Sequence, residues 1–325
     1  MITESKIFKI NDSESFNATA LEIFQEQYKS ISIYKEYVNQ LNVDPTKISN
    51  IDSIPFLPIR FFKSHDIISD IHNPEITFLS SGTTDLKKSK HPLYSTEIYE
   101  KSFLSSFELF YGNISTYTIL ALLPSYLEQQ NSSLIYMVNK LIDLSKKKSG
   151  YISLNDDNIF NKIKNLKNEK VLLIGVSYAL VELSEKYNLD LSNWIIMETG
   201  GMKGKRKELT RKELHKKLQD AFNVRSIHSE YGMTELLSQA YSKNNGHFNY
   251  PPWMKVLIRE VNDPLSYSDY NKTGGINIID LANIYSCSFI ATDDLGKIYS
   301  DGSFEVLGRF DQSDIRGCNL LNSNI

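Results

Sequence analysis

Hydrophobic residues near the N-terminus recur at the spacing of an amphipathic helix. They are Phe16, Leu21, Phe24, Tyr28, Ile31, Tyr34 and Val38, with one weak break near Ser30 and Ser32. The pattern predicts two helices between residue 13 and about residue 42. In residues 51–62, by contrast, Pro55 and Pro58 stand among apolar residues, which favours an extended path pressed against a core.

Short apolar runs further along the chain alternate with helical patterns. The runs are residues 76–79, 118–123, 171–176 and 194–197, and the helical patterns include residues 134–147 and 178–187. This rhythm predicts an α/β fold with mostly parallel sheets flanked by helices. After Gly246 the pattern changes to strands and turns, and Asp301-Gly302 predicts a hairpin between residues 297–299 and 304–307.

The expected organisation is one continuous domain over residues 1–325. Its approximate regions are a helical and extended N-terminal part at 1–72, an α/β core at 73–245 and a smaller β-rich part at 246–325. No internal repeat or linker separates autonomous domains.

Composition excludes several classes of protein. The chain has 325 residues, of which 41% are hydrophobic and 23% charged, so it can bury a large core. The longest apolar run, residues 117–123, is much shorter than the ~20 residues that span a bilayer, so no membrane span is expected. The N-terminus shows no apolar stretch typical of a secretory signal, so a cytoplasmic location is expected. A net charge of −3 gives no reason to expect nucleic-acid binding.

A loop rich in small hydroxyl residues follows the apolar run at 76–79. It reads SSGTT and comprises Ser80, Ser81, Gly82, Thr83 and Thr84. Hydroxyls can donate to phosphate oxygens, glycine allows backbone N–H groups to approach, and Lys87, Lys88 and Lys90 supply positive charge. The alternative is a polar loop with a solvated lysine cluster.

Two further motifs lie toward the C-terminus. EYGMTE spans residues 230–235, and the Thr292-Asp293-Asp294 element is followed fifteen residues after Asp294 by Arg309 in GRFDQSDIRGC. Gly200 and Gly201 follow the run at 194–197. Each signal alone is also consistent with a surface turn or a surface salt bridge.

Together and in this order, the three motifs resemble those of adenylate-forming enzymes, which join a carboxylic acid to AMP at the expense of ATP. Within that group the chain is most similar to the LuxE-type acyl-protein synthetases. The stretch IPFLPIRFFK at 54–63 adds to this likeness. The resemblance implies the large-lobe fold of that superfamily, and ATP and Mg²⁺ as its cofactors.

The resemblance also assigns roles to individual residues. Tyr231 would stack on adenine, Thr234 would hold the α-phosphate, and Glu235 would bind Mg²⁺. Gly200, Gly201 and Gly232 would border the nucleotide, Asp294 would grip the ribose, and Arg309 would meet the ribose or a phosphate. Lys88 is the candidate for the lysine of the phosphate loop. The chain departs from the family pattern at Asp85, Lys87 and Asp293, which replace glycine, proline and glycine.

The tail carries a further candidate, Cys318. The resemblance leads us to expect an early ending without the small C-terminal lid of typical adenylate-forming enzymes, as in LuxE-type proteins. In those proteins a cysteine near the C-terminus accepts the acyl group as a thioester. Cys318 matches that position, with Arg316 or His228 as a cationic neighbour that would help it ionise. The alternative is that Cys318 acts only as a small hydrophobic residue that packs the C-terminus against the protein. Cys287 lies in an apolar strand pattern and is expected in the core.

A basic stretch at 203–217 contains nine Lys, Arg or His residues. Thr210 and Glu213 form a capping-box pattern, and Glu213 is four residues before Lys217, so most of the stretch is expected to be a solvated helix face. A sharper hypothesis is docking of an acidic partner, either an acyl carrier protein or an acyl reductase.

Three functions are compatible with these observations. The first is an ATP-dependent acyl-protein synthetase for a fatty or other hydrophobic acid, whose acyl pocket we expect around residues 117–126 and 135–138. The second is an acyl- or aryl-CoA ligase resembling phenylacetate-CoA ligases. The third is a binding subunit that holds acyl chains or nucleotide without turnover.

Overall fold

The computed structural model describes residues 4–80, 88–124, 131–156, 158–200, 209–261, 263 and 265–310. The helices there are α1 Glu4–Ile7, α2 Ser13–Ser30, α3 Ser32–Gln40, α4 Phe61–Ser64, α5 Thr96–Tyr111, α6 Ser133–Leu144, α7 Ile159–Lys164, α8 Ser177–Lys186 and α9 Arg211–Phe222. Short 3₁₀ turns lie at Pro45–Lys47, Ile51–Ser53 and Ile114–Thr116. No described helix is both long enough and apolar enough to cross a membrane.

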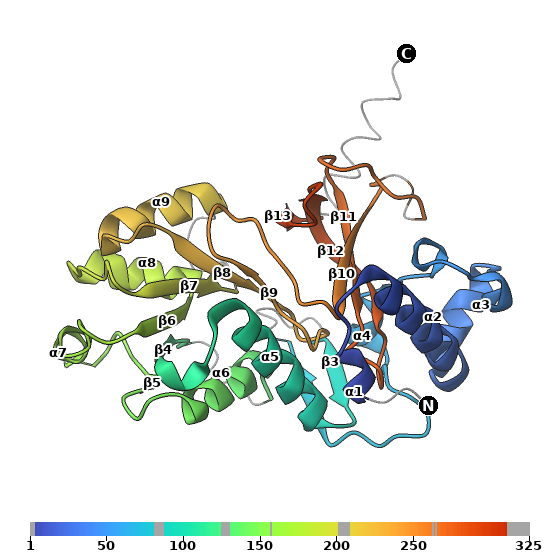
Figure 1. Cartoon of the computed structure of the whole chain (residues 1–325), viewed down its shortest axis with the longest axis horizontal. Helices are drawn as coiled ribbons and strands as arrows, with labels where there is room; N and C mark the ends of the chain where they lie inside the picture. The colour runs from blue at the N-terminus through green and yellow to red at the C-terminus, as the bar shows by residue number, and fades with distance from the viewer. Residues whose placement is uncertain are drawn as a thin grey trace, which may run out of the picture.

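The central layer is a sheet ordered β5-β4-β6-β7-β8-β9. Its strands are β4 Thr118–Leu122, β5 Gly150–Tyr151, β6 Val171–Val176, β7 Ile195–Thr199, β8 Ile227–Tyr231 and β9 Ala240–Ser242. All neighbours pair in parallel except β8 and β9. Helices α8 and α9 lie on one face and α5 and α6 on the other (Figure 1). The expected α/β fold is therefore confirmed.

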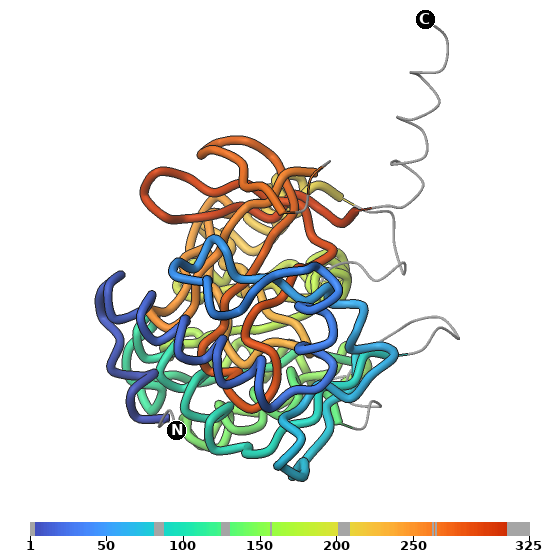
Figure 2. The backbone as a smooth tube through the Cα atoms, turned by 90° about the vertical axis from the view of Figure 1, so that its right-hand side faces the viewer, coloured from blue at the N-terminus to red at the C-terminus, as the bar shows by residue number. Residues whose placement is uncertain are grey.

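A second sheet forms the C-terminal part of the described chain. It is ordered β1-β12-β11-β10, with β13 paired to β12, and its strands are β1 Leu57–Pro58, β10 Met254–Arg259, β11 Gly274–Asp280, β12 Phe289–Ile298 and β13 Phe304–Arg309. The hairpin predicted at Asp301 and Gly302 joins β12 to β13. Helices α2 and α3 lie over this sheet (Figure 2), where Phe24 and Tyr34 pack against Phe289.

The run at 76–79 does not join the parallel sheet, which corrects the expectation from the sequence. It forms β2, Ile76–Leu79, which pairs antiparallel with β3, Lys90–Leu93, in a separate ribbon. The two strands are only a short loop apart, whereas parallel neighbours need a crossover of a dozen or more residues. The sequence did not predict β3 because Pro92 lies within it. Proline in a strand pattern argues against a central strand, since it is tolerated only at sheet edges and bulges.

The extended path expected at 51–62 is correct only for its middle. Leu57 and Pro58 form β1, but a 3₁₀ turn precedes them and α4 follows. The Asn50 side chain accepts from the Ser53 N–H and thereby caps the first turn.

Asp280 joins the two sheets at the end of β11. Its side chain is fully buried and accepts hydrogen bonds from the backbone N–H of Leu237 at 2.8 Å and of Ser238 at 2.9 Å. It also accepts from the Ser238 hydroxyl at 2.6 Å and from the Ala282 N–H at 3.2 Å. These bonds attach the segment between β8 and β9 to the C-terminal sheet.

Replacing Asp280 with alanine should destabilise the fold by about 3 kcal/mol, because it leaves buried donors without an acceptor. Urea unfolding followed by circular dichroism measures the change. Asp269→Ala is the matched control, since the Asp269 side chain is largely exposed and contacts Lys272 at the surface. Equal stabilities of the two variants would show that Asp280 does not hold the sheets together.

Candidate active site

Two of the candidate segments follow strands at one edge of the six-stranded sheet. Strands β4, β6, β7 and β8 run parallel, so their carboxyl ends lie at the same edge, which is where open α/β sheets bind ligands. Gly200 directly follows β7, and residues 232–235 directly follow β8. The candidate residues Ser81, Gly82, Thr83, Thr84, Gly201 and Cys318, and also Arg316 and Tyr126, lie outside the described residues.

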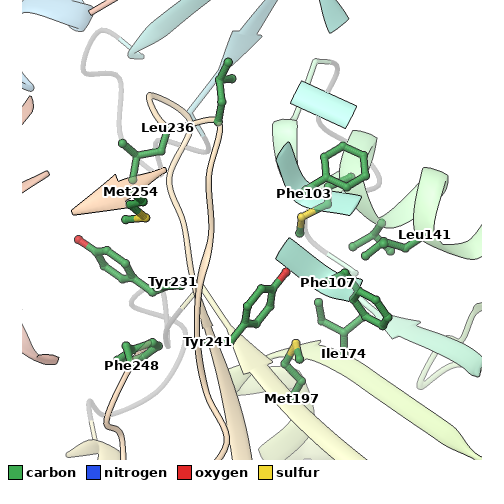
Figure 3. Packing of buried hydrophobic residues seen from close by; sticks show 14 of the residues in the cluster. Phe103, Phe107, Leu141, Ile174, Met197, Tyr231, Leu236, Tyr241, Phe248 and Met254 are labelled. Carbon is green, nitrogen blue, oxygen red and sulfur yellow. The ribbon is translucent and has the colours of Figure 1, made fainter. Parts of the chain in front are cut away.

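Tyr231, Asp294 and Arg309 come together between the two sheets. The Tyr231 hydroxyl donates to Asp294 Oδ2 at 2.8 Å, and Arg309 Nε lies 3.3 Å from Asp294 Oδ1. The Tyr231 ring packs edge-on against Phe304 and lies beside Phe248 (Figure 3). Residues separated by 63 positions in the sequence thus form one cluster.

The Asp294 carboxylate is buried, whereas Arg309 extends outward. Burial raises the pKa of Asp294, and the Arg309 charge and the Tyr231 hydroxyl partly offset this shift. The Arg309 side chain is 83% exposed, so its guanidinium has donors free for a further anion. Thr292 fixes the local backbone, because its hydroxyl donates to the Ile276 carbonyl and accepts from the Asp294 N–H.

The turn that carries Thr234 and Glu235 is held through its carbonyl groups. A ring nitrogen of His91 lies 2.7 Å from the Thr234 carbonyl oxygen, and Asn283 Nδ2 donates to the Glu235 carbonyl at 2.9 Å. The second ring nitrogen of His91 contacts Asn283 Oδ1 at 3.1 Å. Strand β3 and the segment after β11 therefore position this turn together.

Glu235 presents a buried carboxylate that suits a hard cation. Burial raises its pKa, and hydrogen bonding from Ser89 and the charges of Arg309 and Lys63 only partly offset the shift. Mg²⁺ prefers carboxylate oxygens together with phosphate oxygens of a substrate. The donor chemistry of Glu235 therefore fits the expected metal.

The base of the hydroxyl-rich loop is closed by two serines. The Ser80 N–H donates to the Ser89 carbonyl at 3.0 Å, and the Ser89 N–H donates to the Ser80 hydroxyl at 2.9 Å. Lys90 is engaged with Asp66 at 3.3 Å. Lys88 is exposed and makes no ion pair within the described part of the chain, so it is the better placed of the two for an incoming phosphate.

Gly200 and Gly232 leave room at the ends of β7 and β8. Gly200 has φ of 70°, a conformation that favours glycine. A Cβ on Gly232 would lie 2.5 Å from Glu230 Oε1. Both glycines are exposed, so the backbone at this edge is open to a ligand.

A group of buried polar residues at this edge was missed from the sequence. Glu198 at the end of β7 accepts from Ser177 and lies 3.5 Å from Arg211 and 3.6 Å from His215. Burial works to raise the pKa of Glu198, but His215 and Arg211 outweigh it and the pKa is lowered. The available signal was an acidic residue inside an otherwise apolar strand pattern.

Two expectations about charged residues are wrong. His228 cannot supply positive charge to a thiol near neutral pH, because burial lowers its pKa to about 4. Glu213 does not pair with Lys217: Glu213 bonds back to Thr210 in the capping box, and Lys217 reaches Glu185 on α8. The capping box itself is confirmed, and Cys287 is buried in the core as expected.

Comparison with solved structures identifies the fold. 2-Hydroxyisobutyryl-CoA ligase in an open conformation, with 2-HIB-AMP and CoA, matches 92% of this chain and 70% of that chain with a TM-score of 0.69 and 9% identity. This chain has the fold of that ligase. ATP-bound MatB from Rhodopseudomonas palustris matches 72% of this chain, but only 47% of its own length, with a TM-score of 0.53 and 17% identity. No protein-family model and no curated protein matches the sequence.

Acid pH should weaken the fold through two buried histidines. Burial lowers the pKa of His91 and of His228 to about 4, so the stability that depends on their neutral rings is present above about pH 6.5 and is lost as the pH falls toward 4. In urea unfolding at a series of pH values, His91→Gln should flatten this dependence and the surface variant His247→Gln should not. An unchanged slope in His91→Gln would contradict the prediction.

Asp294→Ala should weaken ATP binding about tenfold or more, because it removes a carboxylate that can accept hydrogen bonds from a ribose. The matched control is Asp293→Ala, since Asp293 pairs with Arg60 at 3.1 Å on the other side of the backbone. Titration calorimetry with ATP gives the affinities, and thermal melts confirm that both variants fold. Equal ATP affinities of the two variants would show that Asp294 does not contact the nucleotide.

Proposed function

We propose that this protein activates a carboxylic acid with ATP to form an acyl-adenylate. The observation that carries the proposal is the cluster of Tyr231, Asp294 and Arg309 beside the turn of Thr234 and Glu235, on the fold of a CoA ligase. In this reaction a carboxylate oxygen attacks the α-phosphorus of ATP. The bond to the bridging oxygen breaks, and pyrophosphate leaves with the electron pair.

Each residue of the cluster has a definite part in the proposal. Asp294 accepts from the ribose hydroxyls, and Arg309 donates to the ribose or to a phosphate. The ring of Tyr231 lies against adenine, and the hydroxyl of Thr234 donates to an α-phosphate oxygen. Ser80 and Lys88 hold the outer phosphates together with the loop between them. Bound by Glu235, Mg²⁺ would neutralise charge on the leaving phosphates.

The acyl group then passes to a thiol. The resemblance to LuxE-type synthetases supports the thiol of Cys318, whose thiolate would attack the mixed anhydride and release AMP. In that reading the acid is fatty or otherwise hydrophobic. The final acceptor is an acyl reductase or an acyl carrier protein, which docks on the basic residues of α9, among them Lys212 and Lys216.

CoA is the second candidate acceptor. The observation that favours it is the neighbouring ligase, which has been captured with 2-HIB-AMP and CoA in its thioesterification state and matches 92% of this chain with a TM-score of 0.70. A subunit that binds nucleotide without turnover is the third reading, and it agrees with the substitutions at Asp85 and Asp293.

Carboxylate-dependent exchange of labelled pyrophosphate into ATP tests the activation step, with the intact-protein mass recorded in parallel. We expect exchange with at least one acid and an acyl adduct that disappears in Cys318→Ser while exchange persists. Exchange without an adduct, accompanied by acyl-CoA formation in Cys318→Ser, would replace the protein acceptor by CoA. Tight ATP binding with no exchange for any acid would leave only the binding subunit.

A further inference from the structure

A buried carboxylate on the opposite side of β8 is not used by the reaction described above. Glu230 directly precedes Tyr231, and successive side chains of a strand point to opposite faces. Glu230 is opposite Tyr241 in the register of β8 and β9. Figure 3 shows Tyr231 and Tyr241 on opposite sides of these strands, so Glu230 faces away from the nucleotide cluster.

Only one oxygen of Glu230 has a partner among the described residues. Oε2 accepts from the Thr199 hydroxyl at 2.5 Å, where β7 ends. Oε1 has no such donor, and it lies 2.5 Å from the point where a Cβ on Gly232 would stand. Glu230 is only 8% exposed, so this acceptor is directed at the glycine of the motif from inside the protein.

The side chain of Gln239 lies near the same point. The Cγ of Gln239 is 3.4 Å from the same point above Gly232, and its Oε1 is buried with no hydrogen-bond partner in the described structure. The Gln239 side chain is 3% exposed. Buried polar groups in folded proteins are normally paired, so Gln239 Oε1 and the Glu230 oxygen that has no donor among the described residues require an explanation.

The surroundings of this pair in the described part of the chain are mainly aromatic, and Lys243 Nζ lies 5.6 Å from the centre of the Tyr111 ring. Tyr241 packs against Tyr111 and Phe110 with ring centroids 5.4 Å apart in each case. Burial raises the pKa of Glu230 to about 7, and the negative charge of Glu198 adds to the shift. Within the part of the chain that the structure describes, Glu230 therefore lacks the compensation that Arg211 and His215 give to Glu198.

We propose that Glu230 and Gln239 recognise the acid substrate, and that this acid carries a hydrogen-bond donor, a hydroxyl or an ammonium group, on its chain. The inference rests on the proposed function and narrows its substrate. The acid would lie at the end of β8, with its carboxylate toward the nucleotide side of Gly232 and its donor toward Glu230 Oε1. An unsubstituted fatty acid would supply no donor to the buried Gln239 Oε1 or to Glu230 Oε1, which is costly.

Pyrophosphate exchange with matched acids tests the inference on the full chain. The panel consists of butyrate and octanoate, each compared with its alpha-, beta- and gamma-hydroxy and amino derivatives. We expect one substituted acid to exceed its unsubstituted parent by about tenfold or more in kcat/KM. Equal or better exchange with every unsubstituted parent overturns the inference and leaves the activation step intact. No exchange with any acid overturns the proposed function and this inference with it.

Variants assign the preference to residues. Glu230→Leu and Gln239→Leu should each reduce the ratio of kcat/KM between the substituted and unsubstituted acids. Glu230→Gln shows whether the donor of the acid is a hydroxyl or an ammonium group, because a neutral amide can still accept from a hydroxyl but no longer pairs with an ammonium charge. Glu100→Gln is the control and should leave the ratio unchanged, because the Glu100 carboxylate pairs with Lys140 on α6. Thermal melts verify folding, and a ratio unchanged in both leucine variants overturns the assignment.

Discussion

The geometry of the site depends on the hydrogen bonds that the buried Asp280 carboxylate accepts from Leu237 and Ser238. The residues proposed to bind the nucleotide come from two sheets, since Tyr231 ends β8 and Asp294 lies in β12. Asp280 is the last residue of β11 in the C-terminal sheet. Its side chain accepts hydrogen bonds from the backbone N–H groups of Leu237 and Ser238, just after the turn of Thr234 and Glu235. A buried carboxylate is tolerated when hydrogen bonds satisfy it. The same bonds therefore stabilise the junction of the sheets and fix the distance between the two halves of the site.

The alternation of side chains along β8 divides the site into two sides. Tyr231 turns toward Asp294, whereas Glu230 turns toward Thr199. Gly232 comes directly after Tyr231 and has no side chain. At this residue only the backbone separates the side that holds Tyr231 from the side that holds Glu230. An acid on one side and a nucleotide on the other could meet at this glycine, which is what attack on an α-phosphorus requires.

The sequence predicted the elements with strong local patterns. The buried strands β4 and β6 and the capping box at Thr210 were found, because apolar runs and capping chemistry are local. Pairing is not local, and so the sequence misplaced residues 76–79. It could identify Tyr231, Asp294 and Arg309 as candidates through the resemblance, but not that Asp294 pairs with both of the others. Partners of buried charges depend on tertiary packing that no spacing reveals.

The buried acids at the junction differ in how well they are compensated, and that difference separates structural from ligand-binding roles. Asp280 has four hydrogen-bond donors, and Glu198 has Arg211 and His215. Among the described residues, Glu235 has hydrogen bonding from Ser89 and Glu230 has the Thr199 hydroxyl, but neither has a cation in contact, and burial raises the pKa of both. An uncompensated buried carboxylate costs stability, and that cost is recovered when a cation or donor binds. Glu235 lies on the side proposed to bind the nucleotide, where a metal would neutralise it. Glu230 lies on the other side, where the acid substrate proposed above would supply a further donor.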